Sequence, residues 1–317
     1  MCRRGGCRTL LEERRHDRPG SDVLLFPALH FLWALSKLKL EHKSARLRFR
    51  CAMFDLLDLL LLKRGLPADD QSLAFRRIDG NPQSKVVYFL PWNTPFAFAR
   101  STGMAPLDFL AAYEMPPAIV SSDPHRSVEA LHGLVGDAKA VLTKHGVAPR
   151  DALLVGLSVG TYAATYLANQ LAARLCFVAG ADRADLMMWQ SPAARLVKKR
   201  AMQKGYRWSH YAKAMLGYHP VHNLAGIARD SLFVLGQRDP FVPPRRADGL
   251  LSAIEKQVPG ARTVKLNGGH LKTLMASGRH QLQMAGAESP ARWRLRLPRF
   301  LARAGRVPGE LSPTPQR

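Results

Sequence analysis

The sequence has few cysteines, and their spacing supports neither a metal site nor a disulfide framework. The four cysteines of the 317 residues are Cys2, Cys7, Cys51 and Cys176, and none belongs to a C-x-x-C pair. This usage is atypical of zinc and thioredoxin sites and suits a reducing compartment. Cys176 lies in an apolar run, which predicts a small buried side chain. We therefore expect a cytoplasmic protein without disulfides.

Long hydrophobic runs are also missing. A membrane-spanning helix needs roughly 20 consecutive apolar residues. The best candidate, residues 23–35, is shorter and is interrupted by a proline and a histidine. A second candidate, residues 53–62, contains Asp55 and Asp58. Both stretches are predicted to be amphipathic or packing helices, and no cleaved signal is expected.

The motifs of common cofactor sites do not occur. The chain has no H-E-x-x-H spacing, no Walker motif and no dinucleotide-binding G-x-G-x-x-G motif. We therefore expect that the protein needs neither a metal nor another cofactor.

Acidic residues are scarce. The chain has 24 Asp and Glu against 47 Lys and Arg, a net charge of +23. Most of the excess lies in residues 1–50 (net +7), 182–215 (net +6) and 279–317 (net +6). Such patches attract nucleic acid, anionic membranes or anionic substrates, and they also promote solubility. The absence of a helix-turn-helix pattern and of a basic groove with interleaved aromatics argues against nucleic acid, whereas peripheral membrane contact stays open.

Strands and helices are predicted to alternate through the middle of the chain. Expected strands cover residues 72–79, 85–90, 118–122, 152–157, 175–180, 231–236 and 262–267, and expected helices cover residues near 106–114, 126–146, 159–173 and 244–257. Most of these strands are apolar throughout, which predicts a sheet covered on both faces. The pattern therefore indicates an α/β class with a doubly wound, mostly parallel sheet.

The flanking residues divide the chain further. Residues 1–20 are predicted to be a disordered basic arm, and residues 21–70 a helical extension with helices near 24–40 and 44–63. The α/β domain is expected over residues 71–280, followed by a basic tail over residues 281–317. Because sites in such sheets form at the carboxyl ends of strands, the polar residues there are the candidates for function.

One strand end carries the pattern GLSVG, residues 156–160. It follows an apolar strand and precedes an alanine-rich helix, so Ser158 would lie on a tight strand-to-helix turn. Gly156 and Gly160 would leave room where larger side chains clash. The N–H groups at the start of the helix favour a developing oxyanion. The pattern predicts that Ser158 is a nucleophile.

A serine hydroxyl needs a base, and the base needs an orienting carboxylate. Asp239, in QRDPFVPP, and His270, in NGGH, each follow a predicted strand. Asp182 follows another strand and is the alternative acid, although the turn around Asp239 fits the role better. Other histidines are predicted to be surface or capping groups: His125, His219 and His222.

Taken together, GLSVG, FVLGQRDPFVPP and VKLNGGH resemble the motifs of the α/β-hydrolase fold superfamily, over roughly residues 72–280. The resemblance implies an α/β-hydrolase fold in which Ser158 is the nucleophile. It also implies that His270 is the general base and acid, and that Asp239 orients His270. The backbone N–H of Val159 would be one oxyanion donor.

The second oxyanion donor is expected in the loop after residues 85–90. Members of the superfamily often have a His-Gly or glycine-rich run there, whereas this chain has Leu90-Pro91-Trp92-Asn93. Pro91 has no N–H, so the backbone of Trp92 is the expected donor. Asn93 offers an additional polar group for the substrate.

Residues 182–217 lie where the superfamily commonly inserts a helical lid. Their methionines and aromatics, including Met188 and Trp189, suit an acyl chain. Their basic cluster suits an anionic substrate end or a negatively charged surface. A solvated basic face on a pair of amphipathic helices explains the same composition equally well.

These features predict a serine hydrolase that cleaves a carboxylic ester or thioester through an acyl-enzyme intermediate. One alternative is an acyltransferase that uses the same triad. Another is a non-catalytic protein of this fold that binds a ligand or partner. A third is a role at membranes or nucleic acid through the basic arms.

Overall fold

A computed structural model describes residues 56–60, 62–63, 65, 71–242 and 244–286. The predicted basic arm, most of the predicted helical extension and residues 287–317 lie outside these ranges. Residues 56–60 and 62–63 are helical. Within the described part of the chain, every helix is too short or too polar to cross a membrane.

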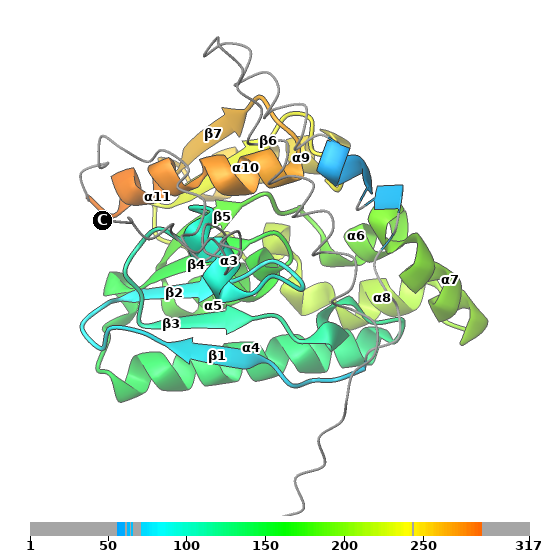
Figure 1. Cartoon of the computed structure of the whole chain (residues 1–317), viewed down its shortest axis with the longest axis horizontal. Coiled ribbons are helices and arrows are strands. Elements are labelled where there is room, and N and C mark those ends of the chain that lie inside the picture. The colour runs from blue at the N-terminus through cyan, green and yellow to red at the C-terminus, as the bar shows by residue number, and fades with distance from the viewer. Residues whose placement is uncertain (1–55, 61, 64, 66–70, 243, 287–317) are drawn as a thin grey trace, which may run out of the picture. The chain divides into compact units, whose positions relative to one another are not determined.

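A seven-stranded sheet forms the centre of the described structure (Figure 1). Its strands are β1 (Arg76–Asp79), β2 (Val86–Phe89), β3 (Ala111–Glu114), β4 (Leu153–Leu157), β5 (Arg174–Val178), β6 (Leu232–Gly236) and β7 (Arg262–Leu266). Their order is β1-β3-β2-β4-β5-β6-β7. Only the pairing of β1 with β3 is antiparallel. The predicted class, a doubly wound and mostly parallel sheet, is confirmed.

Helices connect and cover the strands. The α-helices are α3 (Phe96–Ser101), α4 (Pro124–Lys144), α5 (Gly160–Leu171), α6 (Ala184–Gln190), α7 (Arg195–Gln203), α8 (Trp208–Ala214), α9 (Pro244–Gln257), α10 (His270–Ala276) and α11 (Gly278–Met284). Short 3₁₀ helices are η1 (Pro117–Val120), η2 (Pro149–Asp151), η3 (Pro192–Ala194), η4 (Leu216–Tyr218) and η5 (Pro220–His222). The longest, α4, begins with a proline whose missing N–H costs nothing there, and the Asp123 side chain caps its first turn.

Two hydrophobic cores lie on opposite faces of the sheet. Successive side chains of a strand point to opposite faces. In β2, Val87 and Phe89 therefore enter the core that contains side chains of α4, α5 and α9. Tyr88 enters the second core, which contains side chains of α3, α10 and α11. Burial on both faces explains why the central strands are apolar throughout.

Two predicted elements are wrong. The stretch expected as a helix near residues 106–114 contains β3, and the strand expected over residues 118–122 is largely the 3₁₀ helix η1. Ala111, Ala112 and Tyr113 are fully buried between β1 and β2, so sheet pairing outweighs the helical propensity of the alanines. Pro116 and Pro117 follow, and neither has an N–H with which to continue the ladder.

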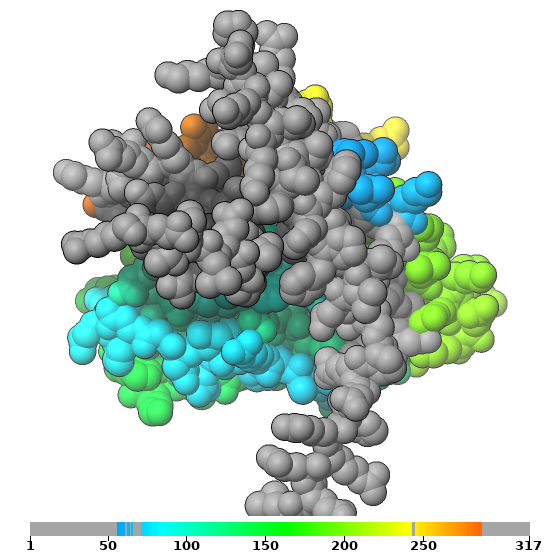
Figure 2. Space-filling model, in the orientation of Figure 1, coloured from blue at the N-terminus to red at the C-terminus, as the bar shows by residue number. Residues whose placement is uncertain are grey.

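Helices α6, α7 and α8 come between β5 and β6, in the segment predicted as a lid. They lie at the end of the sheet toward which the parallel strands run (Figure 1). The guanidinium group of Arg195, in α7, donates to the backbone carbonyls of Leu62 and Lys63. Figure 2 shows this neighbourhood, with the helical residues 56–60 and 62–63 in blue beside the yellow-green segment of α6 and α7. The segment before the sheet thus contacts the segment inserted into it.

Candidate active site

Ser158 lies on a strained turn between β4 and α5. Its φ of 55° is in the left-handed region, which non-glycine residues seldom adopt. Its backbone N–H is bonded to the carbonyl of Val178 at 2.9 Å, which fixes the turn to the neighbouring strand. The serine is only partly exposed.

The two glycines of the turn permit close backbone approach. A Cβ on Gly156 would lie 2.6 Å from Cα of Thr161, and one on Gly160 would lie 2.3 Å from the carbonyl oxygen of Phe89. A Cβ does not approach a non-bonded backbone atom this closely, so only glycine fits either position. The absence of both side chains lets α5 start directly behind Ser158 and against the end of β2.

His270 lies at the first residue of α10, just beyond β7, and contacts two side chains from other strand ends. Its Nε2 atom is 2.9 Å from Oγ of Ser158. Its Nδ1 atom is 2.7 Å from Oδ2 of Asp239. The structure therefore brings the three residues predicted as a triad into one hydrogen-bonded chain.

The carboxylate of Asp239 is held on both oxygens. Its Oδ1 atom accepts hydrogen bonds from the N–H groups of Phe241, at 2.9 Å, and Val242, at 3.2 Å. The side chain is buried, and Oδ2 alone faces His270. A carboxylate fixed in this way sets the orientation and the tautomer of the imidazole.

The electrostatic surroundings of His270 favour its charged form. Burial lowers the pKa of His270, but attraction to Asp239, the hydrogen bond with Asp239 and attraction to Asp58 together raise it above the ordinary value. A basic imidazole whose Nε2 faces a serine hydroxyl is suited to accept the serine proton.

Two other groups could have competed for these roles. Asp182, the alternative acid, is buried and pairs with Arg246 at 3.3 Å, and it has no hydrogen bond or ion pair with His270. Cys176 is buried in the core, and burial raises the pKa of its thiol to about 12. The first carboxylate is thus engaged elsewhere, and the thiol is kept protonated and away from solvent.

The predicted oxyanion donors come from the two segments that meet at Gly160. Val159 lies at the N-cap of α5, where backbone N–H groups have no partner within the helix. Trp92 follows the end of β2 and is half-buried against the same core as Val159. Asn93 is exposed, with a φ of 51°. The backbone around Trp92 and Asn93 therefore makes a tight turn beside the elbow.

The predicted substrate residues of the lid are not free side chains. Met188 is buried in the core shared with α4 and α5. Trp189 is half-buried between the ring of Tyr211, 5.7 Å away, and Nζ of Lys198, 5.2 Å from the indole centre. No hydrogen bond or ring contact joins either residue to Ser158 within the described part of the chain.

A buried polar cluster in the lid was missed by the sequence analysis. Asp185 accepts from both Arg183 and the indole N–H of Trp208, and Oδ1 of Asp185 lies 3.2 Å from Nε2 of His219. The prediction of His219 as a surface or capping group is wrong, because its side chain is fully buried. Burial and the charge of Arg183 and His222 lower the pKa of His219 to about 4 despite attraction to Asp185. The imidazole is therefore neutral, and the cluster joins α6, α8 and the turn at His219 to one another.

A second carboxylate near His270 was also missed. Asp58 is buried and accepts a hydrogen bond from the backbone N–H of Leu271, the residue after His270. In the sequence it is only a polar interruption of a leucine-rich run. The two residues are separated by 213 positions, and no local pattern predicts that contact.

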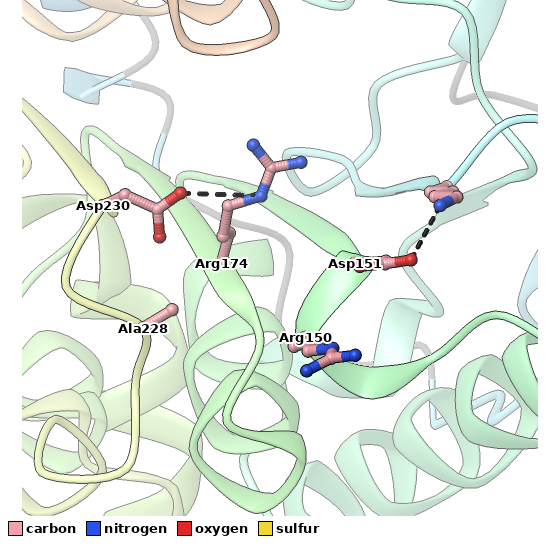
Figure 3. Close-up of a pocket in the computed structure, with 6 residues that line it drawn as sticks. Arg150, Asp151, Arg174, Ala228 and Asp230 are labelled. Atoms are coloured by element: carbon pink, nitrogen blue, oxygen red, sulfur yellow. Dashed lines mark hydrogen bonds and ion pairs between the residues drawn. The ribbon is translucent and has the colours of Figure 1, made fainter.

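A hollow at the opposite edge of the sheet has a different character (Figure 3). It is lined by Lys85, Arg150, Asp151, Arg174, Ala228 and Asp230, near the amino ends of β2, β4, β5 and β6. Most of its charges are paired, Lys85 with Asp151 at 2.7 Å and Arg174 with Asp230 at 3.8 Å. It holds no nucleophile with a base, so Ser158 marks the better candidate for catalysis. The described residues also contain no cluster of three groups that could hold a metal.

Comparison with known proteins gives structural similarity only. The sequence matches no family model and no curated protein. Similar solved structures include the enol-lactonase from Burkholderia xenovorans LB400, with 16% identity, 67% of this chain and 96% of that chain covered, and a TM-score of 0.44. A hydrolase from Pseudomonas aeruginosa PA01 has 18% identity, coverage of 67% and 94%, and a TM-score of 0.41.

The capsule O-acetyltransferase of Neisseria meningitidis serogroup A is also similar, with 12% identity, coverage of 67% and 89%, and a TM-score of 0.44. Similarity at this level carries no information about substrate or reaction. The fold assignment rests on the order and direction of the strands and on the turn at Ser158.

Proposed function

We propose that this chain, which has the α/β-hydrolase fold, is a serine hydrolase that cleaves a carboxylic ester or thioester. The observation that carries the proposal is the hydrogen-bonded chain from Ser158 Oγ through His270 to Asp239, with distances of 2.9 and 2.7 Å. A serine on a strained turn, a basic imidazole and a fixed carboxylate are the groups that acyl transfer requires.

In the first step, Ser158 Oγ attacks the acyl carbon while its proton passes to Nε2 of His270. Asp239 stabilises the imidazolium that results. The backbone N–H groups of Val159 and Trp92 stabilise the negative charge on the acyl oxygen. The imidazolium then gives its proton to the leaving alcohol or thiol, and an acyl-enzyme remains.

In the second step, water attacks the acyl-enzyme. His270 takes a proton from the water and returns it to Ser158 when the acid product leaves. Water is the second reactant, and the base, the orienting acid and the oxyanion donors all come from the chain's own residues.

A panel of esters and thioesters of different acyl length tests this proposal on wild type and Ser158→Ala side by side. We expect hydrolysis by the wild type and a loss of roughly 10³-fold or more in kcat for the variant. Equal turnover by both proteins would assign the activity to another group. Wild-type turnover that needs an added alcohol or amine acceptor would indicate acyl transfer to that acceptor in place of hydrolysis.

A further inference from the structure

The helical turn at residues 56–60 exposes leucines and buries an aspartate, the reverse of an ordinary amphipathic helix. Leu56, Leu59 and Leu60 are 49%, 59% and 50% exposed, whereas Asp58 is 2% exposed. Surface helices usually bury their leucines and leave carboxylates in water. Burial of a carboxylate is unfavourable unless a partner compensates, so the interactions of Asp58 explain this orientation.

Asp58 contacts the start of α10, where His270 is the first residue. Its Oδ1 atom accepts from the backbone N–H of Leu271 at 3.2 Å. The backbone N–H of His270 also favours the charged carboxylate. Gly269, at the N-cap, has no side chain to bind these N–H groups. Asp58 therefore takes the place of an N-cap side chain, although it lies 213 positions before Leu271 in the chain.

The contact also places a second negative charge at His270. Asp239 binds Nδ1 of the ring, whereas Asp58 approaches from the backbone side, and both attract the charged imidazole. Burial raises the pKa of Asp58 to about 6, against the lowering effects of His270 and the Leu271 N–H. The charged and titratable groups around His270 in the described structure are Asp239, Asp58 and the Ser158 hydroxyl, and the ring of Phe241 covers one side at 4.7 Å.

We propose that Asp58 is a positioning residue for His270. It fixes the backbone at the start of α10, and its charge stabilises the imidazolium that forms when Ser158 gives up its proton. Its Oδ2 atom has no hydrogen-bond partner among the described residues. Within that part of the chain, the buried carboxylate is therefore hydrogen-bonded only by the backbone of α10. The proposal rests on the serine-hydrolase function proposed above.

Kinetics of Asp58→Asn and Asp58→Ala in the full chain test the proposal. Asn keeps an acceptor for the Leu271 N–H and loses the charge, whereas Ala loses both. We expect kcat to fall about tenfold for Asn, the equivalent of one pKa unit of lost imidazolium stabilisation, and further for Ala, with little change in KM. The acid limb of the kcat/KM profile should move to lower pH in Asp58→Asn, because His270 loses an anion that favours its protonation.

Two controls separate positioning from general damage. Leu59→Ala changes an exposed side chain on the same helical turn and should leave kcat and the pH profile unchanged. A fluorophosphonate titration counts the active sites in each preparation, so that kcat is calculated per active site and not per total protein. A kcat for Asp58→Asn equal to that of wild type, or a loss matched by Leu59→Ala, would overturn the proposal.

A readout that needs no substrate distinguishes this proposal from the proposed function. The titration of the His270 ring is followed by NMR in wild type and Asp58→Asn, with His270→Gln to assign the signal. We expect a lower pKa of His270 in Asp58→Asn. An unchanged pKa refutes the role of Asp58 whatever the activity. A lowered pKa in a protein that turns over no ester keeps the positioning role and refutes the hydrolase.

Discussion

Asp239→Asn is expected to disable the proposed base while leaving its geometry almost intact. In the wild type, Oδ1 of Asp239 accepts from the N–H groups of Phe241 and Val242, and Oδ2 faces Nδ1 of His270 at 2.7 Å. An asparagine must keep its oxygen toward the two backbone donors, because turning it would leave both without an acceptor. Its NH₂ group then faces Nδ1.

A donor at that position reverses the tautomer of the imidazole. Nδ1 must accept a hydrogen bond, so the ring proton moves to Nε2 and points at Ser158 Oγ. An Nε2 that carries a proton cannot take the serine proton. We therefore expect kcat to fall by roughly 10²–10⁴-fold, with a smaller effect on KM.

Steady-state kinetics on one ester measure this effect, with Asp182→Asn as the matched control. Asp182 is also a buried aspartate after a strand of the sheet, but it pairs with Arg246 and has no hydrogen bond to His270. Asp182→Asn should change kcat by less than about threefold once active sites are counted. A loss below tenfold for Asp239→Asn, or a larger loss for Asp182→Asn, would refute the assignment of the acid.

Three further predictions concern the elbow, Asp58 and the lid. Gly160→Ala should destabilise the fold by about 1–3 kcal/mol and abolish activity, because its Cβ would lie 2.3 Å from the Phe89 carbonyl oxygen. The control is Gly136→Ala in α4, where a Cβ meets nothing within 4 Å, and it should stabilise the fold by about 0.4–1 kcal/mol. Urea denaturation measures both changes. The pKa of Asp58 is raised from 3.8 to about 6, so its charged form destabilises the folded protein above that pH. Asp58→Asn should therefore increase the free energy of unfolding by about 1–2 kcal/mol at pH 8. Calorimetry should show that this increase is lost near pH 4, where Asp58 is protonated in the folded protein. Changing Lys198, Lys199 and Arg200 together to Gln should raise KM for anionic esters and leave KM for short neutral esters nearly unchanged. The difference between the two substrate classes should become smaller as the salt concentration rises. An equal loss of activity toward both classes at every salt concentration would show that the three residues support the structure and do not attract substrate.

The central strands and the residues at their carboxyl ends could be predicted from the sequence, because both are encoded in short local segments. The apolar strands β4, β5 and β6 are buried on both faces, and this composition is visible in the sequence. Ser158 and Asp239 follow two such strands, and His270 follows the more exposed β7, each within a short motif. Because parallel strands end at the same edge of a sheet, that edge was predictable without knowledge of the distances.

What the sequence did not predict depends on contacts between distant residues. The residues of β3 have helical propensity, and they form a strand because β1 and β2 pair with them on both sides. Asp58 interrupts a leucine run, and its partner Leu271 lies 213 residues further along the chain. His219 is buried beside Asp185, a residue 34 positions earlier in the chain. Local composition does not encode any of these three environments.

Covalent labelling determines whether Ser158 is an activated nucleophile. The full-length wild type and Ser158→Ala are incubated with a fluorophosphonate, and the adduct is located by peptide mass spectrometry. We expect one phosphonyl group per wild-type chain, on the peptide that contains Ser158, and none on Ser158→Ala. Equal labelling of the variant, or an adduct on another residue of the wild type, would show that Ser158 is not the nucleophile.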